Sequence, residues 1–435
     1  MPALLSFASG LTIPGEPMSV VRDWQRRSPV LSDPQLTRYL LAAVVSMAGT
    51  AVSMVALPIL VYQRSGSPAL TAALTAIDVL PYVDLGPFAG PLADRISRRR
   101  LMVAGNCVSA AAMLSIPVAS QLGMLTVPQV YVVAVVTAVS FVFTDAADFG
   151  ALPALAGRDR LVAAWSMLSG STAAVMALGP GLGGVLVAVA GAPWTVTVDG
   201  GSYLAAALLI AGVAGSFGGA RGQDLSGGMV TRFREALSWL WSHRIVRTLT
   251  LVGFGKSLSS GVVLGLTVVY AVSVLGLSSR DGLIGLLYAA GALGAVAGSV
   301  ILGRLRSACH PAWIALASTI ATSLLVLALA RPWPGLVGAV LLYALSSMAG
   351  QVSIVNGITY RQHVIPDELQ SRVNVIARMI AIGGTPLGAV AGGLITEAWS
   401  VQAAFMAAAA VLAVTAAAAY PALRSAARED PGLSG

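Results

Sequence analysis

Ionisable side chains interrupt several of the long apolar runs in this sequence. A charge in hydrocarbon costs several kcal/mol, so such a side chain normally faces a wet cavity or a partner of opposite charge. An acid placed there can load and unload a proton, and a cation beside it opposes proton uptake by stabilising the carboxylate. The positions with this potential are Asp78, Asp84, Asp145, Asp148, Lys256, Arg378 and Glu397.

The elements that must position these groups are membrane-spanning helices. Of the 435 residues, 57% are hydrophobic and only 10% are charged, a composition that excludes a soluble domain of this size. The apolar residues form runs of about 20, the helical length that crosses about 30 Å of hydrocarbon. We therefore predict an all-α integral membrane protein of twelve transmembrane helices in two pseudo-symmetric six-helix bundles. The runs lie near residues 38–63, 69–91, 101–122, 127–149, 162–190, 194–214, 247–273, 282–303, 312–330, 336–360, 372–397 and 402–423.

Basic residues are shared unevenly between the two sets of connecting loops. Lys and Arg are retained on the cytoplasmic side of a membrane. Both tails and alternate loops hold most of the 26 basic residues, Arg160 and Arg361 among them, whereas the opposite loops hold Arg64, Arg280 and Arg331. The pattern predicts a multi-pass protein of the cell (inner or plasma) membrane with both termini in the cytoplasm.

Asp78 and Lys256 are expected near the middle of the membrane. At 1.5 Å per residue, Asp78 lies roughly 13 Å inside the outer end of its run, and Lys256 is about as deep from the inner end of its own. The pair is a candidate for coupling or substrate binding; alternatively, it is a buried ion pair that only holds two helices together. Glu397 and Asp199 fall near outer helix ends, where we expect water to solvate them.

A second group of charges is expected in the inner half of the helices. Asp145 and Asp148 are three residues apart, which puts them on neighbouring helix faces. Together with Asp84 and Arg378 they are predicted to form an inner charge cluster. Asp78 and Asp84 are six residues apart, about 120° around a helix, so both cannot point squarely at one cavity.

The chain divides at changes of composition. Met18 opens a stretch that resembles an ordinary start, so residues 1–17 are a candidate extension of the gene model. The predicted units are a cytoplasmic tail at 1–36, a six-helix bundle at 37–214, a cytoplasmic linker at 215–246, a second bundle at 247–423 and a tail at 424–435.

The linker and an internal repeat support this two-part plan. The linker sequence MVTRFREALSWLWSHR has one apolar helical face and predicts an amphipathic helix along the inner membrane surface. Asp159 and Leu161 in the fourth-to-fifth connection recur as Asp367 and Leu369 in the tenth-to-eleventh connection. Such a repeat is typical of two homologous halves.

Two glycine-containing motifs lie between and within the predicted spans. GPLADRISRRR at 90–100 places four arginines at a tight inner turn, where an aspartate can accept hydrogen bonds or cap a helix. GPGLGG at 179–184 supplies small residues that let helices approach closely and a proline that kinks them. The positions concerned are Gly90, Asp94, Arg95, Arg98 and Arg99 in the first motif, and Gly179, Pro180, Gly183 and Gly184 in the second.

Both motifs resemble those of the major facilitator superfamily, and the resemblance extends over residues 36–423. GPLADRISRRR is similar to the signature GxLaDRxGRR, with Ser97 in place of a glycine, and this resemblance implies a gating role for the motif. GPGLGG is similar to the GPxxGG core of the antiporter motif, whose upstream glycines are replaced here by Val175 and Ser166. The family fold implies that Thr50 and Asn356 line the central cavity and that the protein is a monomer.

Within the superfamily, FTDAADFGALPAL and RQHVIPDELQSRVNV most resemble the branch that holds the enterobactin exporter and the macrolide efflux proteins, which export small molecules. The sequence also departs from this branch. Ala146 replaces the proline of an FxDPAR-like segment, and Asp148 stands where a basic residue is common. Many relatives carry an acid in the first span around Thr50, so the proton site of this chain is expected elsewhere.

Other chemistries find no support in the sequence. GPGLGG also satisfies G-x-G-x-x-G, but no strand precedes it, which excludes a dinucleotide site, and Thr250 replaces the glycine that a P-loop ending in GKS at 255–257 requires. Cys107 and Cys309 are too few and too far apart for a disulfide framework or a metal site. A net charge of +8 comes from scattered arginines and not from one basic face, so no nucleic-acid partner is expected.

These observations predict a transporter and not an enzyme. We expect export of a small amphipathic molecule such as a drug, siderophore or secondary metabolite by alternating access, as antiport against protons, with the proton gradient in place of a cofactor. The expected partners are the small-molecule substrate and the lipid bilayer. Two alternatives stay open: an importer of the same fold, and a membrane sensor or partner protein that does not transport.

Overall fold

Local chemistry sets the ends of the first long helix, α3 (Pro34–Ser65). The Asp33 side chain caps its start, accepting hydrogen bonds from the backbone N–H groups of Gln35 (3.0 Å) and Leu36 (3.3 Å). The helix ends at Gly66, whose φ of 64° lies in the left-handed region that glycine adopts without strain. The apolar run between these signals therefore forms one helix.

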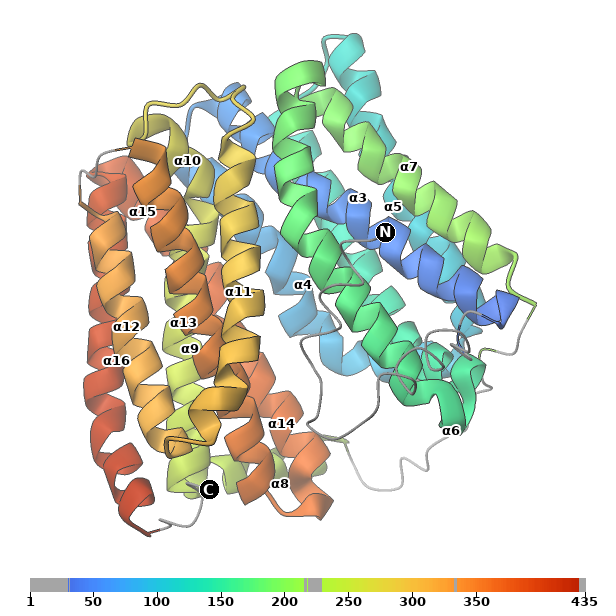
Figure 1. Cartoon of the computed structure of the whole chain (residues 1–435). Coiled ribbons are helices and arrows are strands. Elements are labelled where there is room, and N and C mark those ends of the chain that lie inside the picture. Colours follow the sequence, from blue (N-terminus) through green and yellow to red (C-terminus); the bar gives the residue numbers. More distant parts are fainter. Residues whose placement is uncertain (1–29, 31, 215–216, 218–228, 332–334, 430–435) are drawn as a thin grey trace, which may run out of the picture.

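The N-terminal half is built from five helical elements. The structure is a computed structural model that describes residue 30, residues 32–214, residue 217, residues 229–331 and residues 335–429 (Figure 1). Helix α6 contains two spans, because Gly157 has a non-helical φ of 68° and kinks the chain. The elements are α3, α4 (Pro68–Arg95), α5 (Arg98–Gln121), α6 (Val127–Ala190) and α7 (Ala192–Ala211).

The C-terminal half completes the set of membrane-length helices. In the described part of the chain, 11 helices are long and apolar enough to cross a membrane, or 12 when α9 and α10, which meet at 47°, count as one span. No strand occurs in these residues, so the predicted all-helical membrane fold is confirmed. The elements are α8 (Met229–Ser242), α9 (Arg244–Gly265), α10 (Thr267–Ser273), α11 (Ile284–Arg306), α12 (Pro311–Leu329), α13 (Gly335–Val364), α14 (Asp367–Ile382), α15 (Gly384–Ala398) and α16 (Val401–Glu429).

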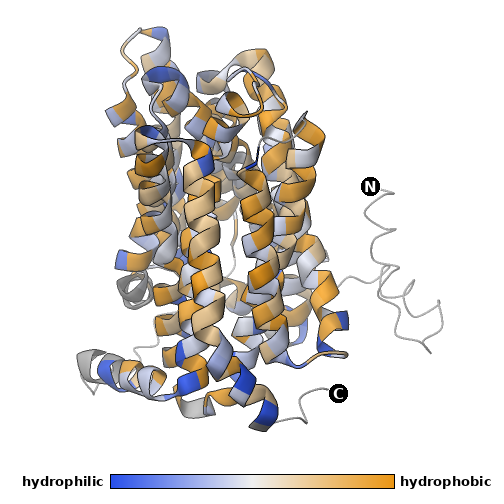
Figure 2. Ribbon diagram, turned by 90° about the vertical axis from the view of Figure 1, so that its left-hand side faces the viewer, coloured by the Kyte–Doolittle hydropathy of each residue, from blue (hydrophilic) through white to orange (hydrophobic). Residues whose placement is uncertain are grey.

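Successive spans run in opposite directions, so the molecule has two faces. We call the face where α3 begins and α16 ends the terminal face, and the face at Gly66 and Gly191 the distal face. Figure 1 shows α8 and the end of α16 together at the bottom, on the terminal face. In Figure 2, hydrophobic residues cover the middle of the helices, as expected for contact with lipid.

The two halves meet at the distal face. Helix α4 packs against α15, and α6 packs against α11. A Cβ atom on Gly393 would lie 2.8 Å from the Cα atom of Ala69, so α15 and α4 touch there through their backbones. Nearby, the Gln63 amide donates a hydrogen bond of 3.0 Å to the carbonyl oxygen of Ser279. Close backbone packing therefore closes this end of the interface.

The predicted linker helix exists as α8, but its apolar face packs on protein. Ala236 and Leu240 are fully buried in a cluster with Val373 and Ile376 of α14. Trp241 is exposed at 47%. The structure adds that α14 offers a matching apolar face to this helix. The place of α8 along the inner membrane surface stays a prediction.

Candidate functional site

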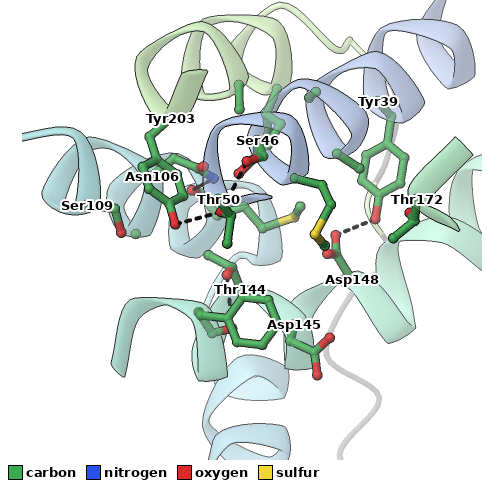
Figure 3. Close-up of a pocket in the computed structure, with 18 of the residues that line it drawn as sticks. Tyr39, Ser46, Thr50, Asn106, Ser109, Thr144, Asp145, Asp148, Thr172 and Tyr203 are labelled. Carbon is green, nitrogen blue, oxygen red and sulfur yellow. Dashed lines mark hydrogen bonds between the residues drawn. The ribbon is translucent and has the colours of Figure 1, made fainter. Parts of the chain in front are cut away.

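A cavity of about 230 Å³ lies within the N-terminal half, between α3, α5, α6 and α7 (Figure 3). Tyr39, Ser46 and Thr50 line it from α3, because positions four and seven residues apart share one face of a helix. From α6, Asp145 and Asp148 contribute the two acids of the lining. The first half thus presents carboxyl and hydroxyl groups in one internal space.

Two hydrogen bonds organise this cavity. The Tyr39 hydroxyl donates to the Asp148 carboxylate at 2.5 Å. The hydroxyls of Thr50 and Tyr203 lie 3.1 Å apart and share a hydrogen bond. Figure 3 shows the Asp148 side chain turned toward Tyr39, whereas the carboxylate of Asp145 points away from them. Thr50 therefore lines this cavity of the first half and holds Tyr203 there by a hydrogen bond. Its place in the central cavity between the halves stays a prediction.

Apolar and aromatic side chains form the rest of the wall. Met47, Phe141, Phe149 and Trp165 all line the same space. A mostly apolar pocket with a few fixed polar groups is the usual form of a small-molecule site. The cavity suits an amphipathic molecule by this criterion.

The predicted inner charge cluster forms only in part. The Arg378 guanidinium of the other half lies 5.2 Å from the centre of the Tyr82 ring. Asp145 is near enough to both for an electrostatic interaction, but it forms no ion pair within the described residues. Asp148 turns instead to Tyr39, and Asp84 is exposed without a partner in the described chain. Sequence reasoning missed Tyr82, because an aromatic residue in an apolar run carries no charge signal.

Asp78 and Lys256 do not form the predicted alternative, a buried ion pair. No ion pair joins them among the described residues. Asp78 is exposed on α4, and the Tyr203 hydroxyl is close enough to interact with it electrostatically. Lys256 is buried on α9, and its hydrogen-bond partner in the described part of the chain is the Thr322 hydroxyl, at 3.5 Å. Asp78 and Lys256 are expected at similar depths in the membrane, but similar depth on two helices does not bring their side chains together.

The prediction that water solvates Asp199 is wrong. Its side chain is fully buried on α7, and its Oδ2 atom has no hydrogen-bond partner among the described residues. The Ser202 hydroxyl lies 3.4 Å from Oδ1, and a Cβ atom on Gly49 of α3 would lie 2.6 Å from that same oxygen. Helix α7 begins seven residues earlier, about 10 Å along the axis, which takes Asp199 well below the helix end.

Asn356 also differs from its expected place in the cavity wall. It is fully buried, and its amide nitrogen donates a hydrogen bond of 2.7 Å to the Pro311 carbonyl at the start of α12. The side chain therefore ties α13 to α12. Arg361, which the sequence places in a connecting loop, is 6% exposed inside α13. Its position shows that α13 extends beyond the predicted end of that span.

Two arginines of the motif donate hydrogen bonds to backbone carbonyls within the first half. Arg98 donates a hydrogen bond of 3.1 Å to the Phe217 carbonyl, and its guanidinium lies over Gly150 of α6. Arg99 donates to the carbonyl of Ala211, the last residue of α7. The structure does not describe the surroundings of Gly90 or the side chains of Asp94 and Arg95, so the gating role of the motif stays a prediction.

The glycines of the GPGLGG motif lie where three helices touch. A Cβ atom on Gly179 would lie 2.5 Å from the Cβ of Ala51, and one on Gly183 would lie 2.8 Å from the Val52 carbonyl oxygen. A Cβ on Gly184 would overlap the carbonyl oxygen of Gly282, across the interface in the other half. A Cβ atom on Gly285 of α11 would likewise overlap the carbonyl oxygen of Pro180. The motif thus joins α6 to α3 and to α11.

Comparison with known families agrees with this architecture. A family model described as transmembrane secretion effector matches residues 30–430. Among curated proteins, the multidrug efflux pump Tap of Mycobacterium tuberculosis is 29% identical over 391 residues, which cover 85% of this chain and 88% of Tap. The enterobactin exporter EntS of Salmonella typhimurium is 25% identical over 309 residues, or 70% of this chain and 72% of EntS.

Solved structures show the same fold. The nucleoside transporter NupG superposes with a TM-score of 0.71 at 13% identity, covering 89% of this chain and 98% of that one. A bacterial homologue of the human lysosomal transporter Spinster, in an inward-facing and unoccupied conformation, gives a TM-score of 0.68 at 15% identity, with coverage of 91% and 97%. At these identities the likeness concerns the fold alone.

Proposed function

This chain belongs to the transmembrane secretion effector family of the major facilitator superfamily, whose members are transporters and not enzymes, and we propose that it exports a small amphipathic molecule in exchange for protons. The similarity to a multidrug efflux pump and to a siderophore exporter supports the direction of transport. The apolar and aromatic wall of the first cavity supports an amphipathic solute.

The observation that carries the proton-coupled part is a set of uncompensated acids. Within the described ranges, none of Asp78, Asp148 and Asp199 lies at ion-pair distance from a Lys or Arg. A carboxylate in the membrane without a cation is costly. Taking up a proton removes that cost, and giving the proton back requires contact with water. The protonation state of such an acid can therefore depend on the side of the membrane from which water reaches it.

Of the three, we assign the coupling role to Asp148. It lies in the wall of the cavity, where a solute and a proton can compete for it, and it is held by a hydrogen bond from Tyr39. Asp78 lies outside that lining, and Asp199 is sealed between α3 and α7. Competition at one site is the simplest way to exchange two ligands in opposite directions.

The closed distal face supports alternating access. With both termini in the cytoplasm, as we propose from the distribution of basic residues, the distal face is the extracellular one. Backbone packing at Gly184 and Gly393 then closes the route to the outside in this conformation. Export requires that this contact open after the solute is bound.

Transport into everted membrane vesicles tests the proposal. We expect antibiotics or siderophores from an amphipathic panel to accumulate in vesicles with an acidic interior, and expect collapse of the pH gradient with nigericin to abolish accumulation. Absence of gradient-dependent flux for every compound would contradict proton-driven export. Accumulation by intact cells, in place of everted vesicles, would identify an importer.

A further inference from the structure

The second half contains its own cavity, of about 430 Å³, between α9, α12, α13 and α14. Among the described residues that line it, three are cations and none is an acid. The first half's cavity has the opposite character, with Asp145 and Asp148 in its wall. The polar lining residues are Lys256, Arg361, Arg378, Ser257, Ser353, Gln362 and Asn374.

Two of these cations are buried with few acceptors. Lys256 is 5% exposed and Arg361 is 6% exposed. The Lys256 ammonium reaches the Thr322 hydroxyl, and the Arg361 guanidinium reaches the Thr250 hydroxyl, both at the long distance of 3.5 Å. Nε of Arg361 has no partner among the described residues. Because lysine carries three N–H donors and arginine five, the described residues occupy only a small part of their donor capacity.

An uncompensated pair of buried cations is expensive. Removing a charge from water costs several kcal/mol unless an opposite charge and hydrogen bonds replace the lost hydration. In the described part of the chain no acid supplies that charge to Lys256 or Arg361. A bound anion would supply it and would also occupy the unused donors.

The cations extend along the cavity at different depths. Arg361 lies three residues before the end of α13, close to the terminal face. Lys256 lies twelve residues after the start of α9, about 18 Å along its axis. Arg378 is exposed on α14 and contacts Tyr82 of the other half. An anion entering from the terminal face therefore meets positive charge from the entrance to the membrane interior.

Apolar side chains complete the wall. Leu249, Val252, Ile354, Ile358 and Ile382 line the same space. An inorganic anion would leave these side chains against water, whereas an organic anion covers them with its apolar part. The combination selects a molecule with both characters.

We propose that this cavity binds the anionic head of an amphipathic molecule, a carboxylate or a phosphate, through Lys256 and Arg361. The inference deepens the proposed function, on which it rests for the identity of the ligand as the exported solute. An acidic membrane lipid has the same head-group chemistry, so the experiment separates these two sources.

Binding of a fluorescent amphipathic carboxylate tests the site. The probe is 11-(dansylamino)undecanoic acid, added to the full-length protein in phosphatidylcholine nanodiscs, with its uncharged primary amide as the matched compound. We expect the carboxylate to bind about tenfold more tightly than the amide, because hydrogen bonds to charged groups are the stronger ones. Equal binding of the two compounds would overturn the proposal.

Matched variants assign the binding to the buried cations. Lys256→Gln and Arg361→Gln are each expected to weaken carboxylate binding about tenfold and to leave amide binding unchanged. Lys256→Arg should restore binding, and Arg304→Gln, which removes a charge at the exposed end of α11, should bind as the wild type does. Wild-type affinity in a folded Lys256→Gln protein would overturn the proposal, even if Arg361→Gln fails to fold.

A lipid arm and a transport arm identify the occupant. If the site holds a lipid head group, phosphatidylglycerol in the nanodisc will displace the probe from the wild type, which supports the site with a lipid as its ligand. If it holds the solute, phosphatidylglycerol will not compete, and everted vesicles will accumulate the carboxylate. Lack of flux by the wild type contradicts the proposed function alone, since the binding result does not depend on transport.

Discussion

The two halves of this transporter share an arrangement of helices but differ in the charge that they enclose. The first half holds Asp145 and Asp148 in its cavity, and the second holds Lys256, Arg361 and Arg378. In neither cavity does the described lining contain a charge of the opposite sign. In our proposal, this pseudo-symmetric frame carries two different ligands, a proton in one half and an anionic group in the other.

Among the described residues, a cation–π contact links the two environments. The Arg378 guanidinium of the second half lies 5.2 Å from the centre of the Tyr82 ring of the first. This contact depends on how the halves are placed, so a rocking motion would make or break it. In the proposed mechanism, such a contact would link the charge difference to coupling as well as to binding.

The largest expected effect follows from removing the acid of the first cavity. Asp148→Asn should reduce gradient-driven export about 100-fold, the upper range of a coupling between two ligands, because the amide cannot release a proton. Transport down a solute gradient should persist. Asp159→Asn, an exposed acid of the same helix, serves as the control. If Asp148→Asn still exports against a gradient, the first half is not the proton-carrying half.

The next effect concerns the contact that holds the halves together. Gly184→Ala places a methyl group against the Gly282 carbonyl oxygen and should disfavour the distally closed state about tenfold. Cysteine cross-linking of residues 63 and 279 at the distal face measures this state. Gly170→Ala, in the same helix with open space around its Cβ position, should cross-link as the wild type does. Unchanged cross-linking in Gly184→Ala would show that the contact does not control closure.

A smaller effect sharpens the assignment of the acid. Tyr39→Phe removes the hydroxyl that donates to Asp148 and should lower export about fivefold, the typical value of one hydrogen bond. Combined with Asp148→Asn, it should have no further effect, since both changes act on one contact. Fully additive losses in the double variant would separate the tyrosine from the acid.

The smallest effect comes from an acid that has a partner. Asp33 forms an ion pair with Arg160 at 2.9 Å. Partial burial acts to raise the pKa of Asp33, but Arg160 and the backbone N–H groups of Leu36 and Gln35 together hold it below the ordinary value of 3.8. Asp33→Asn keeps a capping group and should cost about 0.2–1 kcal/mol of stability, with no change in export.

The sign of the pH dependence follows from the lowered pKa. The stabilisation by Asp33 is complete above pH 3.8 and is lost as the pH falls through the lower pKa of the folded protein. Thermal unfolding in detergent should therefore distinguish wild type from Asp33→Asn at pH 6 and not at strongly acidic pH. A difference that grows on acidification would refute this assignment.

The sequence predicts the helices well because apolar runs, proline, glycine and capping residues act locally. It also identifies the ionisable positions, since charges stand out in apolar surroundings. Which of them meet is decided by helix rotation and by where each helix ends, and neither is local. Asp199 and Arg361 illustrate this, because each lies in a helix whose buried part extends further than the predicted boundary. The sequence does not single out Tyr82 and Tyr39, because their importance depends on contacts with Arg378 and Asp148 that only the structure shows.

Proton release by the purified protein on addition of solute tests the division of charge most directly. With an anionic amphipathic compound that the wild type exports, we predict a solute-dependent release of protons that disappears in Asp148→Asn. In Lys256→Gln the same release should require about tenfold more solute, because binding and not the proton site is weakened. Proton release that is unchanged in Asp148→Asn, or a Lys256→Gln response at the wild-type solute concentration, would contradict the account.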